Sequence, residues 1–259
     1  MSFYFYKTAI LMVHYGTTFE NTRKETLEKI NNEVKKEFPN FEIKEAYTSR
    51  KILKKLTDKG IFKNSPIDAL EKLAKDKYTH IIIQPTNIIN GSEKKILEEQ
   101  IKLYENKFQE IKLGSVLLEN QNDYKKVAEI INNEMGKIEK DEALLLIGHG
   151  TLNSKNISYT TMENVAKSMG YNFYVGTING YPQIEDIIIK LKRDDVKKVI
   201  LMPFMFVAGY HANKDINNKW KETLEKENFS VEVKLTSLGM INDIRKIFIE
   251  HIKSMIENL

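Results

Sequence analysis

The chain has 259 residues, of which 41% are hydrophobic and 29% charged, so it contains enough apolar material for a packed core. That balance excludes wholesale disorder, a collagen-like structure and a coiled coil. The chain contains no cysteine, which excludes disulfide scaffolds, thiolate zinc sites, iron–sulfur clusters and cysteine nucleophiles. The formal net charge is +4 and is spread along the chain, without the basic stripe of a nucleic-acid-binding protein.

The N-terminal segment does not have the form of a signal peptide. Lys7 lies inside its apolar stretch, and no small-residue cleavage site follows. The longest apolar stretches, such as residues 199–207, are much shorter than the ~20 residues that a membrane-spanning helix needs. We therefore expect a soluble, cytoplasmic protein with neither a membrane nor a nucleic acid as partner.

Short apolar runs alternate with helical patterns along the chain. The runs are bounded by turn residues and are typical of strands buried on both faces. Between them, apolar residues recur every three or four positions, as Leu27, Ile30 and Val34 do, which is typical of helices with one buried face. This alternation predicts an α/β fold with parallel sheets covered on both faces. In chain order, the main predicted elements are a strand at 8–13, a helix at 20–38, strands at 80–84 and 113–118, a helix at 123–135, strands at 143–147, 173–175 and 199–203, a helix at 216–224, a strand at 231–237 and a helix at 241–259.

The order of these elements is repeated in the two halves of the chain. Residues 9–17 (AILMVHYGT) resemble residues 143–151 (ALLLIGHGT), and residues 79–95 resemble residues 198–214 in their order of strand, proline, apolar segment and glycine. We therefore predict two similar Rossmann-like lobes, residues 1–136 and 137–259, around a central cleft. Aligning the halves pairs three positions of the first with three of the second: Tyr15 with His149, Arg50 with Asn179, and Glu93 with His211.

All the paired positions follow the carboxyl ends of predicted strands, where open α/β sheets bind ligands. Of the five histidines, His14, His149 and His211 lie in strand-to-helix turns, whereas the other two fit structural or solvated roles. A capped turn histidine is the simple alternative for each, but the repeat favours a shared function for His149 and His211. The chain has no phosphate-binding loop and no nucleophile elbow, so we expect neither a nucleotide nor a hydrolase of that type.

Several segments, taken in order, resemble the anaerobic-type sirohydrochlorin cobaltochelatases. They are AILMVHYGTTFENTRKETLEKI, EAYTSRKILKKL, YTHIIIQPTNIINGSE, LLLIGHGT, VGTINGYPQIEDII and VILMPFMFVAGYHANKDI. The resemblance covers nearly the whole chain and implies the class II chelatase fold, in which two α/β lobes surround a tetrapyrrole cleft as in ferrochelatase. It also implies ATP-independent insertion of cobalt(II) into sirohydrochlorin in cobalamin biosynthesis.

The resemblance also implies roles for particular residues. His149 and His211 match the family's two histidines, which bind metal and accept pyrrole protons, and Glu93 matches a family glutamate that assists them. Asn179 stands where family members have a metal-binding glutamate, so it is a candidate ligand through its amide oxygen. His14, where the family has serine, is either an added ligand that compensates for Asn179 and contacts the substrate, or a surface turn histidine. Two further departures replace family histidines with asparagine, at Asn87 and Asn153.

The chemistry of metal insertion suits these groups. An imidazole that titrates near pH ~6.5 can act both as a metal ligand and as a proton acceptor. Arg50 is a candidate partner for the substrate's carboxylates, or else a structural ion pair. Nitrogen and oxygen donors do not select cobalt over iron or nickel, so a chelatase for another metal or a related tetrapyrrole remains an alternative. A tetrapyrrole- or metal-binding protein that has lost turnover is another, and the sequence leaves open whether the chain forms a homo-oligomer.

Overall fold

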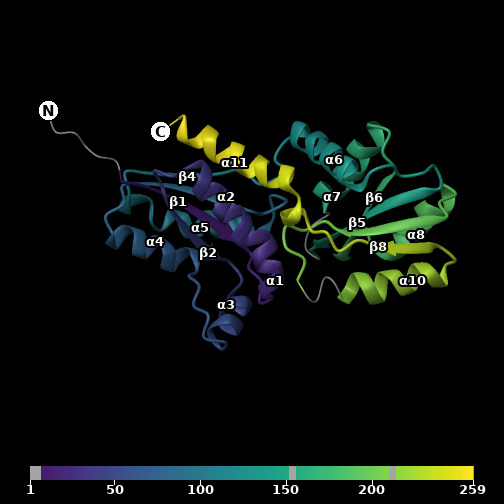
Figure 1. Cartoon of the computed structure of the whole chain (residues 1–259), viewed down its shortest axis with the longest axis horizontal. Helices are drawn as coiled ribbons and strands as arrows, with labels where there is room; N and C mark the ends of the chain where they lie inside the picture. Colours follow the sequence, from purple (N-terminus) through teal and green to yellow (C-terminus); the bar gives the residue numbers. More distant parts are fainter. Residues whose placement is uncertain (1–6, 152–155, 210–213, 259) are drawn as a thin grey trace. The chain divides into compact units, whose positions relative to one another are not determined.

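The computed structural model describes residues 7–151, 156–209 and 214–258. The chain divides into two compact units, which we call the N-terminal unit (residues 1–119 with 245–259) and the C-terminal unit (residues 120–244) (Figure 1). This division differs from the predicted boundary after residue 136. Helix α6 (Gln121–Met135) belongs to the C-terminal unit, and the last helix, α11 (Asn242–Ile256), runs mostly in the N-terminal unit. In the described ranges, no helix is long and apolar enough to cross a bilayer.

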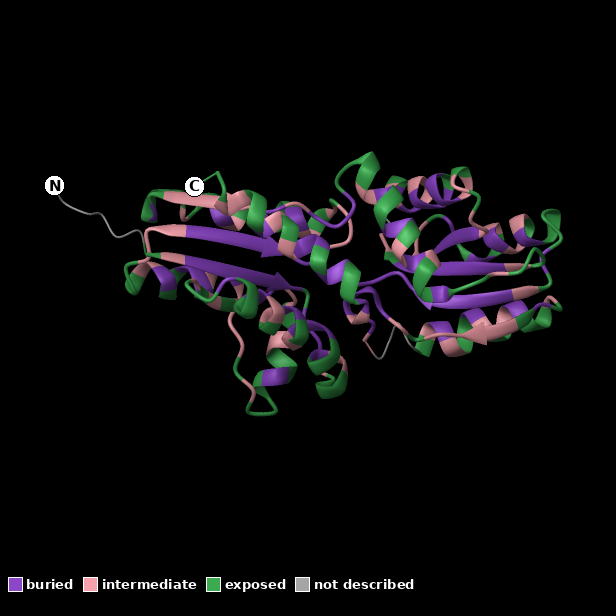
Figure 2. Cartoon of the chain, turned by 45° about the horizontal axis from the view of Figure 1, so that its top comes forward, coloured by how far each residue is buried: buried purple, intermediate pink, exposed green. Residues whose placement is uncertain are grey.

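The N-terminal unit contains a parallel sheet with the strand order β2-β1-β3-β4. Its central strands are apolar through their middle, as expected for strands covered on both faces, and Ala9 to Val13 are 0% exposed. In Figure 2 the central strands are buried, and the exposed residues lie on the outer faces of the helices and in the loops. The strands are β1 (Thr8–His14), β2 (Glu42–Tyr47), β3 (His80–Pro85) and β4 (Glu110–Leu113). The helices are α1 (Glu20–Arg23), η1 (Lys24–Glu28), α2 (Lys29–Glu37), α3 (Arg50–Thr57), α4 (Pro66–Lys75), α5 (Ser92–Lys102) and η2 (Glu105–Lys107).

The C-terminal unit repeats this arrangement. Its sheet is also parallel, with the order β6-β5-β7-β8, which is the first order with each strand replaced by its counterpart in the second half. The predicted pair of similar parallel-sheet units is therefore confirmed. The strands are β5 (Glu142–Gly150), β6 (Phe173–Asn179), β7 (Lys198–Pro203) and β8 (Ser230–Val233), and the helices besides α6 are α7 (Ile157–Ser168), α8 (Ile184–Arg193), η3 (Asp215–Trp220), α10 (Lys221–Lys226) and η4 (Leu238–Met240).

The edge strands are where the sequence prediction fails. Strand β2 was implied only by the placing of Arg50 after a strand end, and no bounds were predicted for it. It alternates exposed and half-buried residues over EIKE and has no continuous apolar run. Strands β4 and β8 begin and end earlier than the predicted 113–118 and 231–237. The apolar residues Val116 and Leu117 are buried, but they follow β4 instead of forming it. The buried apolar residues after β4 thus gave this segment the apolar pattern of a strand although it lies outside the sheet.

An ion pair of the buried Arg245 helps to hold helix α11 in the N-terminal unit. Arg245 is 1% exposed, and its Nε and Nη2 donate to the two carboxylate oxygens of Glu33 on α2, at 2.7 and 2.8 Å. A two-point pair of this kind fixes direction as well as distance. It therefore sets the position of α11 along the helices of the unit.

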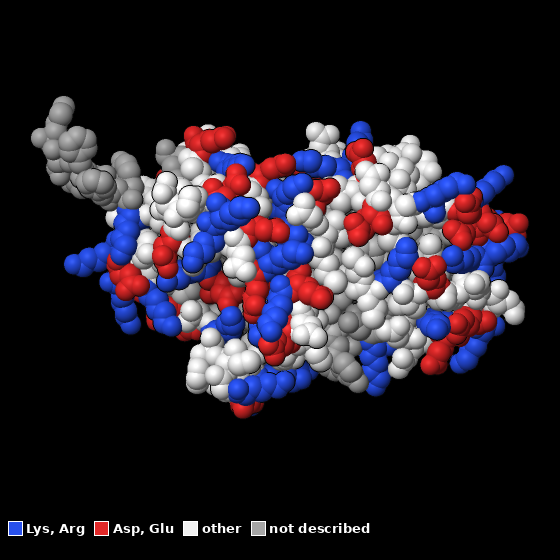
Figure 3. Space-filling view, viewed as in Figure 1, with Lys and Arg blue, Asp and Glu red and all other residues white. Residues whose placement is uncertain are grey.

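Charged side chains of both signs are mixed on the face of the molecule seen in Figure 3. Exposed ion pairs of the chain include Lys24 with Glu20 and Lys253 with Glu37. Exposed pairs contribute little to stability. Their mixture on this face agrees with the even spread of charge along the sequence.

Candidate functional site

The carboxyl ends of β5 and β6 bring His149 and Asn179 together. The register pairs Gly150 of β5 with Asn179 of β6, so His149 precedes the residue that lies opposite Asn179. The side chain of His149 is exposed, and Nδ2 of Asn179 donates to the backbone oxygen of His149 at 3.3 Å. Two of the three predicted metal ligands therefore occupy neighbouring positions on one sheet edge.

The glycines on either side of His149 are required by close packing. A Cβ atom on Gly148 would lie 2.1 Å from the ring of Tyr159 on α7, and one on Gly150 would lie 2.1 Å from the backbone oxygen of Asn179. Gly150 also has a φ of +66°, in the left-handed region that favours glycine. The Tyr159 hydroxyl accepts a hydrogen bond from the Gly150 N–H at 3.3 Å. His149 thus projects from a strand end whose backbone is fixed on both sides.

Asn156, which the sequence analysis did not single out, joins the loops that follow β5 and β6. It is 3% exposed and has a φ of 48°. Its Oδ1 accepts a hydrogen bond from the N–H of Thr151 at 3.1 Å. Its Nδ2 donates to the backbone oxygens of Asn179, at 3.2 Å, and Tyr181, at 2.8 Å. Asparagine tolerates the left-handed region better than most residues. Its residue type is the feature of the sequence that could have pointed to a structural role for Asn156.

The loop after β6 is fixed from a second side by Thr177. Its side chain is buried, and Oγ1 lies 3.0 Å from the backbone oxygen of Gly180 and 3.1 Å from that of Pro182. The N–H of Thr177 donates to the same Pro182 oxygen at 2.8 Å. Between these anchors, the side chain of Tyr181 is 51% exposed. The loop is therefore ordered while its aromatic side chain faces solvent.

The second predicted histidine, His211, lies outside the described residues, as does Asn153. Among the residues that the structure describes, no three His, Asp or Glu side chains lie close enough together to hold a metal ion. A metal site that combines His149 with His211 therefore stays a prediction from the sequence.

The N-terminal unit carries its candidate residues at the corresponding edge of its own sheet. Val13 pairs with Pro85 as Ile147 pairs with Pro203, so Tyr15 is the counterpart of His149, as the sequence repeat indicated. Val13 pairs with Ala46 as Ile147 pairs with Gly176, which makes Ser49 the counterpart of Asn179. The predicted pairing of Arg50 with Asn179 is thus wrong by one residue.

Arg50 and Glu93 both lie in first helical turns after strands of this sheet. Arg50 is the first residue of α3; it is exposed and forms no ion pair with the residues described. An unpaired guanidinium at this edge is compatible with the predicted role in binding carboxylates. Glu93 is the second residue of α5 and is half-buried, in the position where a helix N-terminus favours a carboxylate.

His14 is not at the surface, and that part of its prediction is wrong. It is 1% exposed; its Nε2 lies 3.0 Å from Oδ1 of Asn31 and its Nδ1 lies 3.0 Å from Oγ1 of Thr86. The Asn31 amide nitrogen donates to Glu45 at 2.9 Å, so its oxygen accepts from His14 Nε2, which leaves Nδ1 to accept from Thr86. With both ring nitrogens engaged, His14 offers neither to a substrate.

The burial of His14 predicts a pH dependence of stability. Burial lowers the pKa of His14 below its ordinary value of 6.5. The contribution of neutral His14 to the free energy of unfolding is therefore complete above the pKa that His14 has in the unfolded chain. It is lost as the pH falls from about 6.5 towards the lower pKa of His14 in the folded protein, by at most about 1.4 kcal/mol per pH unit. Urea unfolding followed by circular dichroism at about pH 8 and about pH 5 should show a larger loss for the parental protein than for His14→Gln. Equal losses would contradict a buried neutral His14.

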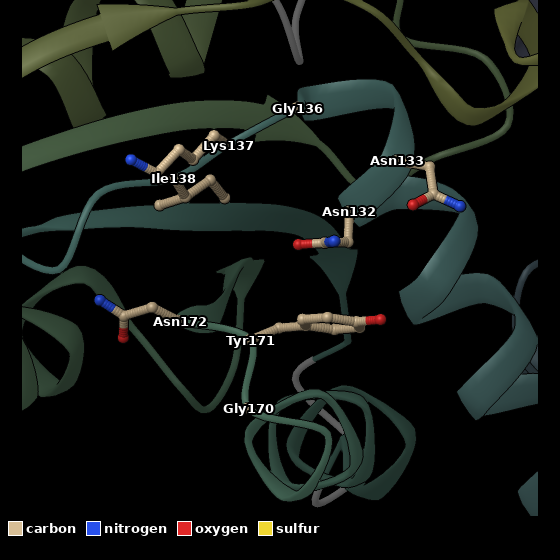
Figure 4. A pocket seen from close by; sticks show the side chains of 8 residues that line it. All are labelled: Asn132, Asn133, Gly136, Lys137, Ile138, Gly170, Tyr171 and Asn172. Carbon is tan, nitrogen blue, oxygen red and sulfur yellow. The ribbon is translucent and has the colours of Figure 1, made fainter.

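A hollow of about 390 Å³ lies in the C-terminal unit, at the opposite end of the strands from His149 and Asn179. It is lined by the end of α6, the segment after it and the turn before β6, with Asn132, Tyr171 and Asn172 among its residues (Figure 4). It lies at the amino ends of β5 and β6, away from His149. Parallel α/β sheets bind ligands at the carboxyl ends of their strands, so we do not assign the site to this hollow.

Comparisons with known proteins match nearly the whole chain. The family model described as "Cobalt chelatase (CbiK)" matches residues 8–257. The sirohydrochlorin cobaltochelatase of Salmonella typhimurium is 29% identical, with 95% of each chain covered. The sirohydrochlorin cobaltochelatase CbiKC of Nitratidesulfovibrio vulgaris is 26% identical, with 98% of this chain and 92% of the relative covered.

Solved structures confirm the fold. SirB from Bacillus subtilis with Fe³⁺ has a TM-score of 0.71 at 16% identity, with 96% of this chain and 95% of SirB covered. CbiX, described as the terminal enzyme for siroheme biosynthesis in denitrifying bacteria, has a TM-score of 0.58 at 16% identity, with 95% and 98% covered. At 16% identity, these two likenesses show a shared fold and nothing about function. The predicted α/β chelatase fold is therefore confirmed.

Proposed function

Because the chain belongs to the cobalt chelatase (CbiK) family, we propose that it inserts cobalt(II) into sirohydrochlorin in cobalamin biosynthesis. The observation that carries the proposal is the family match over residues 8–257, which includes an exposed His149 at the carboxyl edge of the second sheet. The relatives named sirohydrochlorin cobaltochelatase support the choice of tetrapyrrole.

Metal insertion needs a group that takes pyrrole protons and delivers a metal ion. His149 is suited to both tasks, since its side chain is exposed and imidazole can serve as a ligand for divalent first-row metals and as a general base. We assign His211 the same pair of tasks and Glu93 a supporting one, from the sequence. The amide oxygen of Asn179, next to His149, is a neutral metal ligand. Arg50 would pair with a substrate carboxylate.

The reaction as proposed uses no nucleotide. The metal ion is a substrate, and the energy of forming four metal–nitrogen bonds drives its insertion. The cytoplasm as the compartment, and the absence of nucleic-acid and membrane partners, remain predictions from the sequence.

Asn179 favours a second candidate function. A neutral amide where the family has a carboxylate lowers the negative charge available to a divalent ion and removes a proton acceptor. The chain could then select iron or nickel, or bind the tetrapyrrole without turnover.

One experiment separates these functions. Purified protein is incubated with sirohydrochlorin and cobalt(II), iron(II) or nickel(II), and insertion is followed by the absorption spectrum with and without ATP. We expect faster insertion of cobalt than in a protein-free reaction, with no effect of ATP. Binding of sirohydrochlorin without faster insertion would support the binding protein, and acceleration confined to iron or nickel would support the other chelatases.

A further inference from the structure

The loop after β6 carries an exposed aromatic side chain beside the candidate metal ligand. Tyr181 is 51% exposed, two residues after Asn179, whose side chain bonds the backbone of His149. Ile157, the first residue of α7, is 66% exposed, and it follows Asn156, whose amide bonds the backbone oxygen of Tyr181. An exposed aromatic and an exposed aliphatic side chain therefore project from loops whose backbone is linked to that of His149 through Asn156 and Asn179.

These side chains are exposed although their backbone is fixed. Asn156 donates to the oxygens of Asn179 and Tyr181, and Thr177 contacts those of Gly180 and Pro182. An ordered loop loses little conformational entropy when a ligand binds to it. An aromatic side chain held in this way gains most from covering a flat apolar surface.

We propose that Tyr181, together with Ile157, forms the apolar surface on which the tetrapyrrole macrocycle rests while its centre faces His149. The inference rests on the proposed function and names residues to which no substrate contact has been assigned. A macrocycle is flat and apolar in its middle and carries its carboxylates at the rim. A ring centred on a metal ligand at the end of β5 must extend over the neighbouring loop, and that loop presents Tyr181.

The test is a binding titration of metal-free sirohydrochlorin, followed by tetrapyrrole fluorescence, with the full-length protein. Tyr181→Ala should weaken binding about tenfold, in the range for loss of one aromatic stacking contact. Tyr181→Phe keeps the ring and should bind within about twofold of the parental protein, because the proposal gives the hydroxyl no task. Ile157→Ala should weaken binding about threefold, since it removes a smaller area.

Ile189→Ala is the matched control, because Ile189 is 69% exposed on α8 of the same unit and lies outside the proposed surface. It should bind sirohydrochlorin like the parental protein. Unchanged binding by Tyr181→Ala, or equal losses in Tyr181→Phe and Tyr181→Ala, would overturn the proposal. If Tyr181→Ala does not fold, Ile157→Ala decides in its place: parental affinity would overturn the proposal. Failure of the proposed function looks different, because the parental protein itself would then neither bind nor metallate sirohydrochlorin.

Discussion

Replacing His149 by alanine is expected to reduce the rate of cobalt insertion at least about 100-fold, the scale of losing a positioned acid–base group. Folding should be unaffected, because the side chain is exposed and its only described contact is with the backbone oxygen of Gly150. Sirohydrochlorin affinity should change much less than the rate, since the proposed contacts with the macrocycle and its carboxylates lie on other residues.

The rate should therefore be measured at saturating sirohydrochlorin, together with the affinity for the metal-free tetrapyrrole. His149→Gln distinguishes the tasks of His149, since an amide can ligate a metal but is no base at neutral pH. We expect it to be nearly as slow as His149→Ala. His80→Gln is the control, since His80 begins β3 at the opposite edge of the other sheet, and it should insert cobalt normally. A folded His149→Ala protein with the parental rate would remove this residue from the mechanism.

Most of the fold could be predicted from the sequence because it depends on local patterns. Continuous apolar runs identified the central strands β1, β3, β5 and β7, and the repeated order of elements implied two sheets of one topology. Edge strand β2 was given no bounds because one side of it is open and its apolar pattern is weak. A hydrophobic pattern identifies strands by their burial: edge strand β6 is mostly buried and was predicted, whereas most of β2 is exposed or half-buried.

The candidate site could be predicted only in part. His149 was identified because it follows a predicted strand at a position that recurs in the two halves of the chain, and because it matches a histidine of the family. His14 also ends a buried strand just before a turn, yet it is buried against Thr86 and Asn31, which are distant in the sequence. Asn156 was missed because its three hydrogen bonds go to backbone groups of two different loops. Contacts of this kind leave no periodic pattern in a single sequence.

The close contact between Gly150 and the backbone of Asn179 predicts that Gly150 keeps His149 and Asn179 in position. Gly150→Ala should lower the free energy of unfolding of the C-terminal unit by about 3 kcal/mol, through left-handed backbone strain and overpacking. The added Cβ would lie 2.1 Å from the backbone oxygen of Asn179, which a side-chain rotation cannot relieve. Movement of the loop would separate Asn179 from His149, so cobalt insertion should fall as well.

Gly170→Ala is the matched control, because Gly170 has a φ of +83° in the same unit but nothing within 4 Å of its added Cβ. It should lose only about 1 kcal/mol, the strain of the backbone alone, and keep its rate of insertion. The fluorescence of Trp220, the single tryptophan, reports unfolding of this unit because that residue is buried in its core. Equal losses of stability in the two variants would mean that the loop after β6 moves away from the added methyl group at little cost in free energy. His149 and Asn179 would then not be held together by the backbone contact at Gly150.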